Sequence, residues 1–347
     1  MEPISVCIIA KNEEKYLDTC LSALKSFPVE IVVVDTGSTD RTVEIAKKYT
    51  QSVYFFEWCD DFSAARNYAA KMAKNNYIIA LDCDEFVEKI DLKQIEALLE
   101  QYPFGFGNIT LTNLVGNEER MNRYRTTPTR IYDRRFAEFR SRVHEQLCRK
   151  DGGPRAEGNI NMSAVHVGYL MSEEDCRKKN ERNITLLERE IADEKENSYL
   201  YFQLGQSYNA LGQPEKALEA QKKALNFLTD KKAPYVQPLV FTYGDTCLQS
   251  GCYEDALIVQ NYYDELCGSA DYMFILGKVF YANGKIDDAL LAFEAATLCE
   301  NYSEEGMNTY FPLNAMALIY EKLGLPDKAK ECDEKAQSFL KKAMKHL

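Results

Sequence analysis

Two carboxylates two positions apart, Asp82 and Asp84, directly follow an apolar run at residues 77–81. A short, continuous apolar run of this kind predicts a buried strand of a parallel sheet. The carboxyl end of such a strand opens on the crevice in which open α/β sheets bind ligands. Because paired carboxylates suit a hard cation, the spacing predicts a metal or ligand site, with solvated acids at a strand end as the alternative.

Two further apolar runs end in polar residues in the same way. Residues 4–10 lead into Lys-Asn-Glu-Glu, and residues 31–34 lead into Asp-Thr-Gly-Ser-Thr-Asp, which begins at Asp35. The Asp35 carboxylate could accept a hydrogen bond from a uracil-type imide, and an aspartate before Thr-Gly is equally typical of a turn. No G-x-G-x-x-G follows the first run, which argues against a nicotinamide-dependent Rossmann enzyme.

Helical segments separate these strands. Apolar residues at a helical period predict helices over residues 13–25, 39–49, 63–75 and 92–102. Thr39 or Asp40 is the expected N-cap of the second helix, and Asp91 is that of the fourth. Alternation of strands and helices of this length predicts a parallel, doubly wound α/β sheet.

The second half of the chain is helical and repetitive. Residues 172–197 predict one charged helix with an apolar stripe at Ile184, Leu187 and Ile191. Beyond it, glycine and alanine recur in register, with corner glycines 39, 33 and 40 residues apart at Gly212, Gly251, Gly284 and Gly324. The register resembles a tetratricopeptide array, since an ordinary helical bundle would not repeat small residues in this way. We expect a domain at 1–170, a connecting helix at 171–197 and repeats at 198–347.

The charge is acidic overall and basic in one segment. A length of 347 residues allows two domains, and a net charge of −12 argues against nucleic acid as a partner. Between residues 120 and 155, however, eleven basic residues oppose four acidic ones. This segment is either a solvated face or a wall that faces a diphosphate or an acidic acceptor.

Cysteine usage and hydropathy indicate the compartment. The eleven cysteines are scattered and form no C-x-x-C pair, which favours reduced thiols over a disulfide framework or a zinc site. The chain has no signal-peptide pattern at residues 1–10, and no apolar stretch approaches the ~20 residues that span a bilayer. We expect a cytoplasmic protein without a transmembrane segment.

Four segments of the first half resemble the nucleotide-sugar half of the family 2 glycosyltransferases, which have the GT-A fold. They are residues 5–24, 31–42, 62–70 and 78–85, in the order and at the spacing of that family. A weaker resemblance continues to about residue 169. The resemblance implies an α/β GT-A nucleotide-sugar-binding domain, followed here by an all-α tetratricopeptide-like helical repeat domain.

This resemblance also implies a set of site residues. The donor would be a UDP-sugar, with Asp82 facing the ribose or the cation and Asp84 ligating Mn²⁺ or Mg²⁺. Enzymes of this fold commonly return a late histidine to the metal, which implies His166 as a ligand, although a histidine between valines is more often structural. The residues that the resemblance places around the donor are Ala10, Asn12, Glu13, Asp35 and Arg66. For Arg66, a surface ion pair with Asp61 is the alternative.

The acceptor side requires a proton acceptor. Inverting transfer is a single in-line displacement, so one carboxylate or imidazole must take the proton of the acceptor. Glu145 is the first candidate for this catalytic base and His144 the second. A strand-end ion pair with a nearby arginine is the alternative for this segment, and Asp60 or Asp61 is a further candidate base.

The sequence therefore predicts a metal-dependent, inverting glycosyltransferase whose repeats bind or present the acceptor or a protein partner. A peptide acceptor is favoured because tetratricopeptide grooves commonly hold peptides, and the layout resembles bacterial peptide S-glycosyltransferases. Cell-surface polysaccharide or lipid-core transfer is one alternative. The other is a non-catalytic scaffold with a degenerate transferase domain, against which the retention of Asp35, Asp82 and Asp84 argues.

Overall fold

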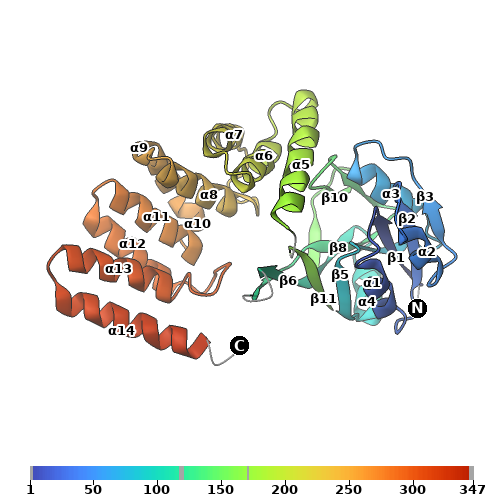
Figure 1. Cartoon of the computed structure of the whole chain (residues 1–347), viewed down its shortest axis with the longest axis horizontal. Helices are drawn as coiled ribbons and strands as arrows, with labels where there is room; N and C mark the ends of the chain where they lie inside the picture. The colour runs from blue at the N-terminus through green and yellow to red at the C-terminus, as the bar shows by residue number, and fades with distance from the viewer. Residues whose placement is uncertain (1–2, 117–120, 170–171, 344–347) are drawn as a thin grey trace. The chain divides into compact units, whose positions relative to one another are not determined.

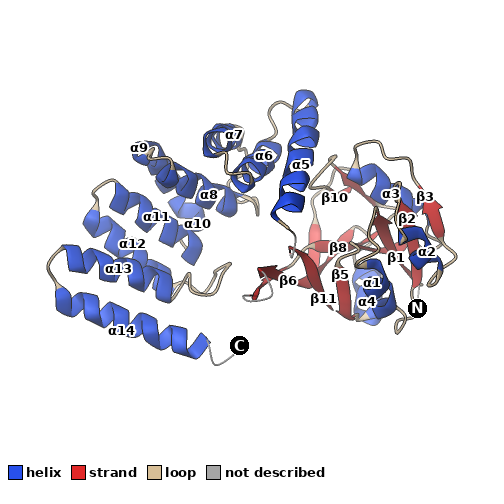
Figure 2. Ribbon diagram, in the orientation of Figure 1, coloured by secondary structure: helices blue, strands red, loops and turns tan. Residues whose placement is uncertain are grey.

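The chain folds as two compact units, Met1–Cys176 and Arg177–Leu347. The structure, a computed structural model, describes residues 3–116, 121–169 and 172–343 (Figure 1). The first unit is a mixed α/β domain, and the described part of the second is built from helices (Figure 2). Among the described residues, no helix combines the length and apolar character that crossing a membrane requires.

A nine-stranded sheet forms the framework of the first unit, in the order β3-β2-β1-β4-β8-β6-β11-β5, with β7 paired to β6. The strands are β1 Ile4–Ala10, β2 Glu30–Asp35, β3 Val53–Phe55, β4 Tyr77–Leu81, β5 Glu85–Lys89, β6 Gly105–Gly116, β7 Met121–Thr126, β8 Thr129–Asp133 and β11 Ala156–Tyr169. Two further strands, β9 Ala137–Arg140 and β10 Gln146–Arg149, form a separate antiparallel pair.

The predicted parallel sheet is present in β1 to β4, and a second parallel pair, β6 with β11, lies beyond an antiparallel strand. Strand β1 pairs in parallel with β2 and β4, and β2 pairs in parallel with β3. Beyond β4 the sheet becomes mixed, because β8 runs antiparallel to both β4 and β6. The carboxyl ends of β1, β2 and β4 therefore meet at one edge, as parallel strands require.

The helices of the first unit are α1 Leu17–Leu24, α2 Thr42–Lys47, α3 Phe62–Met72 and α4 Leu92–Gln101. The predicted cap of α4 is confirmed, since the Asp91 side chain accepts a hydrogen bond from the Gln94 amide at 3.0 Å. Helix α2 begins later than predicted, because the Asp40 carboxylate instead accepts from the Thr42 amide and hydroxyl. Helix α1 also begins late, after a turn in which the Tyr16 amide bonds the Glu13 carbonyl.

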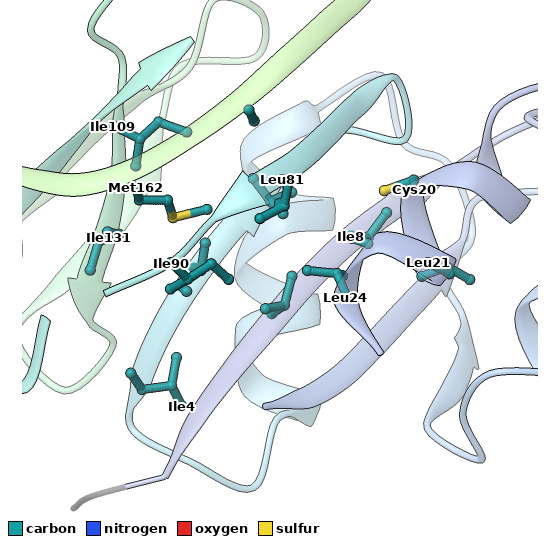
Figure 3. Packing of buried hydrophobic residues seen from close by; sticks show 14 of the residues in the cluster. Ile4, Ile8, Cys20, Leu21, Leu24, Leu81, Ile90, Ile109, Ile131 and Met162 are labelled. Atoms are coloured by element: carbon teal, nitrogen blue, oxygen red, sulfur yellow. The ribbon is translucent and has the colours of Figure 1, made fainter. Parts of the chain in front are cut away.

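Two apolar clusters cover the two faces of the sheet. On one face, Val6 and Ile8 of β1 join a cluster with Leu21 and Leu24 of α1 (Figure 3). On the other face, Cys7 lies in a cluster with residues of β2 and α3. This alternation follows the period of two along a strand, and burial on both faces explains why the β1 run is continuously apolar.

The second unit consists of helical hairpins that follow α5, Glu173–Asp193. The hairpins pair α6 Ser198–Ala210 with α7 Pro214–Asn226, α11 Ala270–Ala282 with α12 Ile286–Leu298, and α13 Tyr310–Lys322 with α14 Pro326–Ala343. In the remaining hairpin, α8 Val236–Gln249 precedes a partner broken into α9 Tyr253–Ala256, a 3₁₀ segment Leu257–Tyr262 and α10 Tyr263–Leu266. The four corner glycines have φ between +66° and +74°, a conformation that favours glycine and explains their repetition.

The prediction for the charged helix was wrong in two respects. Helix α5 ends at Asp193 rather than at 197, because Asn197 caps α6 by accepting from the Tyr199 and Leu200 amides. The buried face of α5 consists of Asn183, Leu186, Leu187 and Glu190, so only Leu187 of the predicted stripe is buried. The face that packs is chosen by tertiary contacts, to which a period of 3.6 residues is only a guide.

Candidate active site

The Asp82–Asp84 pair lies in the tight connection between β4 and β5. The Asp82 amide donates to Glu85 Oε2 at 3.1 Å, and the Glu85 amide donates to the Asp82 carbonyl at 3.1 Å. Cys83 is buried, and its thiol lies 3.4 Å from the Ile9 carbonyl of β1. The intervening residue thus anchors the connection to the sheet and leaves the two aspartates on the outside of the turn.

Asp82 is held between two buried arginines. Arg66 Nη2 donates to Asp82 Oδ1 at 2.6 Å, and Arg130 Nη2 donates to Oδ2 at 2.9 Å. Burial alone raises the pKa of Asp82, but the two guanidinium groups outweigh it and hold this pKa well below its usual range. Asp82 is therefore an ionised carboxylate with a guanidinium on each oxygen.

The ion pairs continue on both sides of Asp82. Arg66 Nε donates to Glu145 Oε1 at 2.5 Å, and Arg130 makes a close ion pair with the fully buried Glu85. Burial raises the pKa of Glu85, although the charge of Arg130 opposes that shift. The result is an alternating series of charges, in the order Glu145, Arg66, Asp82, Arg130 and Glu85.

Asp84 and His166 contact each other at a place that a side chain on residue 168 would occupy. Asp84 Oδ2 lies 3.3 Å from His166 Nε2, and their side chains are 26% and 13% exposed. Gly168 lies beside both, because a Cβ added there would be 2.0 Å from Asp84 Oδ2 and 2.6 Å from His166 Nε2. The Val167 amide donates to the Asp84 carbonyl at 3.1 Å, which fixes β11 against the connection. This arrangement keeps the carboxylate and the imidazole directed at one point.

The loops after β1 and β2 are joined by hydrogen bonds at the same sheet edge. The Asn12 side chain accepts from the Thr39 amide at 2.8 Å, and the Asn12 amide donates to Ser38 Oγ at 2.9 Å. Asp35 is buried and accepts from the Gly37 and Ser38 amides at 3.1 and 3.2 Å. This is the turn arrangement considered above, and a carboxylate with about four lone-pair sites retains capacity for a further donor.

Glu13 belongs to the same electrostatic environment. Its amide donates to Thr42 Oγ1 at 2.7 Å, and its side chain is half-buried. Burial and, after it, the charges of Asp84, Asp82 and Asp40 raise the pKa of Glu13 to about 7. Ala10, the last residue of β1, accepts from the Thr36 amide at 2.9 Å and so brings the β2 loop against this segment.

The Glu145 segment reaches the site from the separate β9–β10 pair. The Phe62 amide donates to the Arg142 carbonyl at 2.8 Å, which ties the segment to the start of α3. Glu145 is 12% exposed and is bound to Arg66 as described. The alternative considered for Glu145, an ion pair with an arginine, is therefore present, but its partner comes from α3 and not from the neighbouring residues. Arg66 does not pair with Asp61, whose carboxylate caps α3 at the Ala64 amide.

Backbone strain is concentrated in the loops of this region. Among the described residues, the non-glycine positions with positive φ are Asn12, Asp60, Ser141 and His144. All four lie in loops that lead to the residues described above. Such conformations cost free energy and persist where the surroundings fix them, which is common at functional sites.

Sequence reasoning missed several residues of the site. Arg130 appeared only as part of a basic segment, and Glu85 only as a neighbour of the aspartates. Asn113 was not singled out, although its Oδ1 lies 2.9 Å from His166 Nδ1. A signal for Asn113 was present, because it continues the inward positions of Ile109 and Leu111 along β6, where an apolar residue is expected.

The donor set fits a hard divalent cation only in part. Within the described ranges, no three His, Cys, Asp or Glu side chains are grouped as a metal site. Asp84 and His166 form a pair with their oxygen and nitrogen 3.3 Å apart, whereas direct ligation by Asp82 would compete with its two arginines. Mg²⁺ is commonly bound by one or two protein groups together with substrate phosphates, and the pair at Asp84 meets that requirement.

Comparisons with known proteins agree with the two-unit architecture. Residues 5–150 match the family described as "Glycosyl transferase family 2", and residues 198–227 and 313–339 match "Tetratricopeptide repeat". The first unit thus contains a segment similar to the family 2 glycosyl transferases, and the second contains two segments similar to tetratricopeptide repeats.

Individual relatives and solved structures match between half and two thirds of the chain. The SPbeta prophage-derived glycosyltransferase SunS of Bacillus subtilis is 29% identical over 227 residues, which are 65% of this chain and 54% of that protein. A TPR repeat-containing protein of Synechococcus elongatus is 30% identical over 209 residues, which are 59% of this chain and 52% of that protein. The chain thus spans about half the length of the curated relatives it matches. The crystal structure of MamA overlaps 51% of this chain and 99% of its own, at 22% identity and a TM-score of 0.42.

Proposed function

We propose that this chain is an inverting glycosyltransferase that moves a sugar from a UDP-sugar to an acceptor, with a peptide side chain as the favoured acceptor class. The observation that carries the proposal is the Asp84–His166 pair, which lies against Gly168 and beside the ionised Asp82. These groups lie next to the carboxyl ends of β1, β2 and β4, where an α/β sheet binds its ligand. The family of residues 5–150 supports the same reaction class.

The donor would lie along the loops after β1 and β2. Ala10, Asn12 and Glu13 line one side, and the buried Asp35 offers an acceptor for the imide N–H of a uracil ring. Asp82 faces this region as a carboxylate whose charge two arginines maintain, which suits an acceptor for a ribose hydroxyl. Specificity for the nucleotide thus comes from side chains whose orientation is already fixed.

Asp84 and His166 are the residues that would hold Mn²⁺ or Mg²⁺. When bound, the cation acts as a Lewis acid that neutralises the charge developing on the departing diphosphate. Gly168 contributes because it has no side chain, and a Cβ there would clash with both residues. Asp82 contributes through charge and hydrogen bonding, since both of its oxygens already accept from arginines.

Glu145 is our candidate for the base, and His144 is the second candidate. As the acceptor nucleophile bonds to the anomeric carbon, its proton passes to the Glu145 carboxylate, and the bond from that carbon to the phosphate oxygen breaks. UDP leaves on the opposite face, so the configuration inverts. Arg66 binds Glu145 and connects it to Asp82, which places the base next to the donor site.

The repeats support a polypeptide acceptor. Tetratricopeptide hairpins form extended surfaces that bind peptides, and SunS, one of the relatives, is described as a glycosyltransferase. Transfer to a cell-surface polysaccharide or a lipid core is the alternative acceptor class. A non-catalytic scaffold is the alternative outside the enzymes, and it predicts no UDP binding at all.

A panel of UDP-sugars with Mn²⁺ tests the proposal. We expect UDP release by the full-length chain, UDP binding by calorimetry, and a mass shift on a cysteine- or serine-containing acceptor peptide. The variant Asp84→Ala should lose cation-dependent activity, whereas the exposed surface variant Glu44→Gln should behave as the wild type. Absence of both UDP binding and UDP-sugar hydrolysis would refute the enzyme and leave the scaffold.

A further inference from the structure

Asn113 occupies a buried position next to His166. It lies on β6 directly opposite His166 of β11 in the parallel register of these two strands. Its side chain is on the inward side of β6 and the residue is 2% exposed. A buried amide must find partners for both its oxygen and its nitrogen, so its surroundings determine which way it points.

Those surroundings orient the amide. Asn113 Nδ2 lies 3.0 Å from Thr126 Oγ1 and 3.5 Å from each of the carbonyl oxygens of Leu111 and Tyr124. Carbonyl oxygens can only accept, so the NH₂ group belongs on that side. The Asn113 Oδ1 atom must then be the one that lies 2.9 Å from His166 Nδ1.

The orientation of Asn113 decides the tautomer of His166. An amide oxygen is only an acceptor, so His166 Nδ1 must carry a proton in order to bond it. In the neutral ring the other nitrogen, Nε2, then presents its lone pair, and it points toward Asp84 Oδ2 at 3.3 Å. At this distance a proton or a cation can bridge the two atoms.

We propose that Asn113 is a positioning residue that holds His166 as the Nδ1–H tautomer and so turns the Nε2 lone pair toward Asp84. This inference rests on the proposed function, because it explains how the Asp84–His166 pair is made ready to hold a cation. The outer partner of a metal-binding histidine typically fixes both its tautomer and its ring orientation. Thr126 supports this role by fixing the amide of Asn113 in turn.

The tautomer can be read without any metal. The chain has three histidines, so ¹⁵N-histidine labelling of the full-length, EDTA-treated protein gives three imidazole ring systems in a long-range ¹H–¹⁵N spectrum. His166→Gln assigns the signals of His166. In the wild type we expect a proton on Nδ1, because the facing atom of Asn113 is an acceptor. A ring that carries no proton on Nδ1 would overturn the proposal.

Two variants of Asn113 separate positioning from packing. Asn113→Leu keeps the approximate shape but removes the acceptor, so the His166 signals should move toward the Nε2–H form. Asn113→Asp keeps an acceptor and should preserve the Nδ1–H form. Asn108→Leu is the matched control on the same strand, because Asn108 bonds Glu157 and Thr129 instead of a histidine. An unchanged His166 spectrum in folded Asn113→Leu contradicts the proposal.

Cation affinity gives the second readout. With UDP present, Asn113→Leu should bind Mn²⁺ about 10–100-fold more weakly than the wild type, while Asn113→Asp and Asn108→Leu stay close to it. Equal Mn²⁺ affinity in the wild type and Asn113→Leu would contradict the positioning role. If the wild type binds no Mn²⁺ but shows the expected tautomer, the metal-dependent function fails while the assignment of the tautomer stands.

Discussion

Arg66 donates its Nε–H to Glu145 Oε1 over 2.5 Å, although 79 residues of chain separate the two. The same guanidinium reaches Asp82 Oδ1 at 2.6 Å, so one side chain on α3 connects the candidate base to the first aspartate of the donor site. Arg66 Cζ also lies 5.4 Å from the centroid of the Phe139 ring. A bidentate, planar cation is required for this bridge, which lysine cannot reproduce.

Loss of Arg66 should destabilise the fold. Arg66→Met leaves Asp82 and Glu145 without one of their counter-charges, and breaking a buried pair by removing one partner typically costs about 3–5 kcal/mol. Urea denaturation monitored by circular dichroism measures the free energy of unfolding. Arg41→Met is the control, because the Arg41 side chain is exposed and pairs with the exposed Glu44, and it should change the free energy of unfolding by less than about 0.5 kcal/mol. If Arg66→Met lowers the free energy of unfolding no more than Arg41→Met does, the ion pairs of Arg66 are not maintained in solution.

Glu145→Gln should lower turnover and leave donor binding intact. The amide keeps a hydrogen-bond acceptor near Arg66 but can no longer take the proton of the acceptor, so we expect a loss of about 10²–10⁴-fold in kcat. Calorimetry with UDP should give a wild-type affinity. Unaltered turnover with a bound acceptor would transfer the role of base to His144 or Asp60, and His144→Asn then discriminates between these two.

Gly168→Ala should impair the site through a single methyl group. A Cβ there would lie 2.0 Å from Asp84 Oδ2 and 2.6 Å from His166 Nε2, distances that real side chains do not adopt, so the carboxylate or the imidazole must move. We expect Mn²⁺ affinity, measured by titration with UDP present, to fall at least about 10-fold. Gly268→Ala serves as the control, because no atom lies within 4 Å of an added Cβ there. Retention of full affinity in Gly168→Ala would mean that Asp84 and His166 do not act as a pair.

Glu13 should make the fold less stable as the pH rises toward neutrality. Its pKa is raised from an ordinary value of 4.5 to about 7, so over this interval the unfolded chain loses a proton that the folded chain retains. The free energy of unfolding therefore falls between about pH 4.5 and pH 7, and the loss is complete above the folded pKa. Glu13→Gln should remove this part of the pH dependence in EDTA-treated protein. Parallel stability profiles for the two proteins would contradict the shift.

Much of the fold could be predicted from local sequence. The three apolar runs were predicted as strands and are β1, β2 and β4, since uninterrupted apolar residues are stable only where both faces of a strand are buried. The Asp91 cap and the corner glycines were predicted from rules that involve only neighbouring residues, and the structure confirms both. Helix α5 was predicted less well, because its buried face depends on what packs against it.

The same distinction between local sequence and tertiary contacts applies to the site. The sequence by itself determined that carboxylates follow β4 and that polar loops follow β1 and β2, because strand ends and turns are encoded by adjacent residues. Only the tertiary structure decided that Arg66 and Arg130 share Asp82, that Glu145 joins them, and that Asn113 faces His166. These contacts depend on strand order and register, which bring together residues far apart in the chain and which no local pattern specifies.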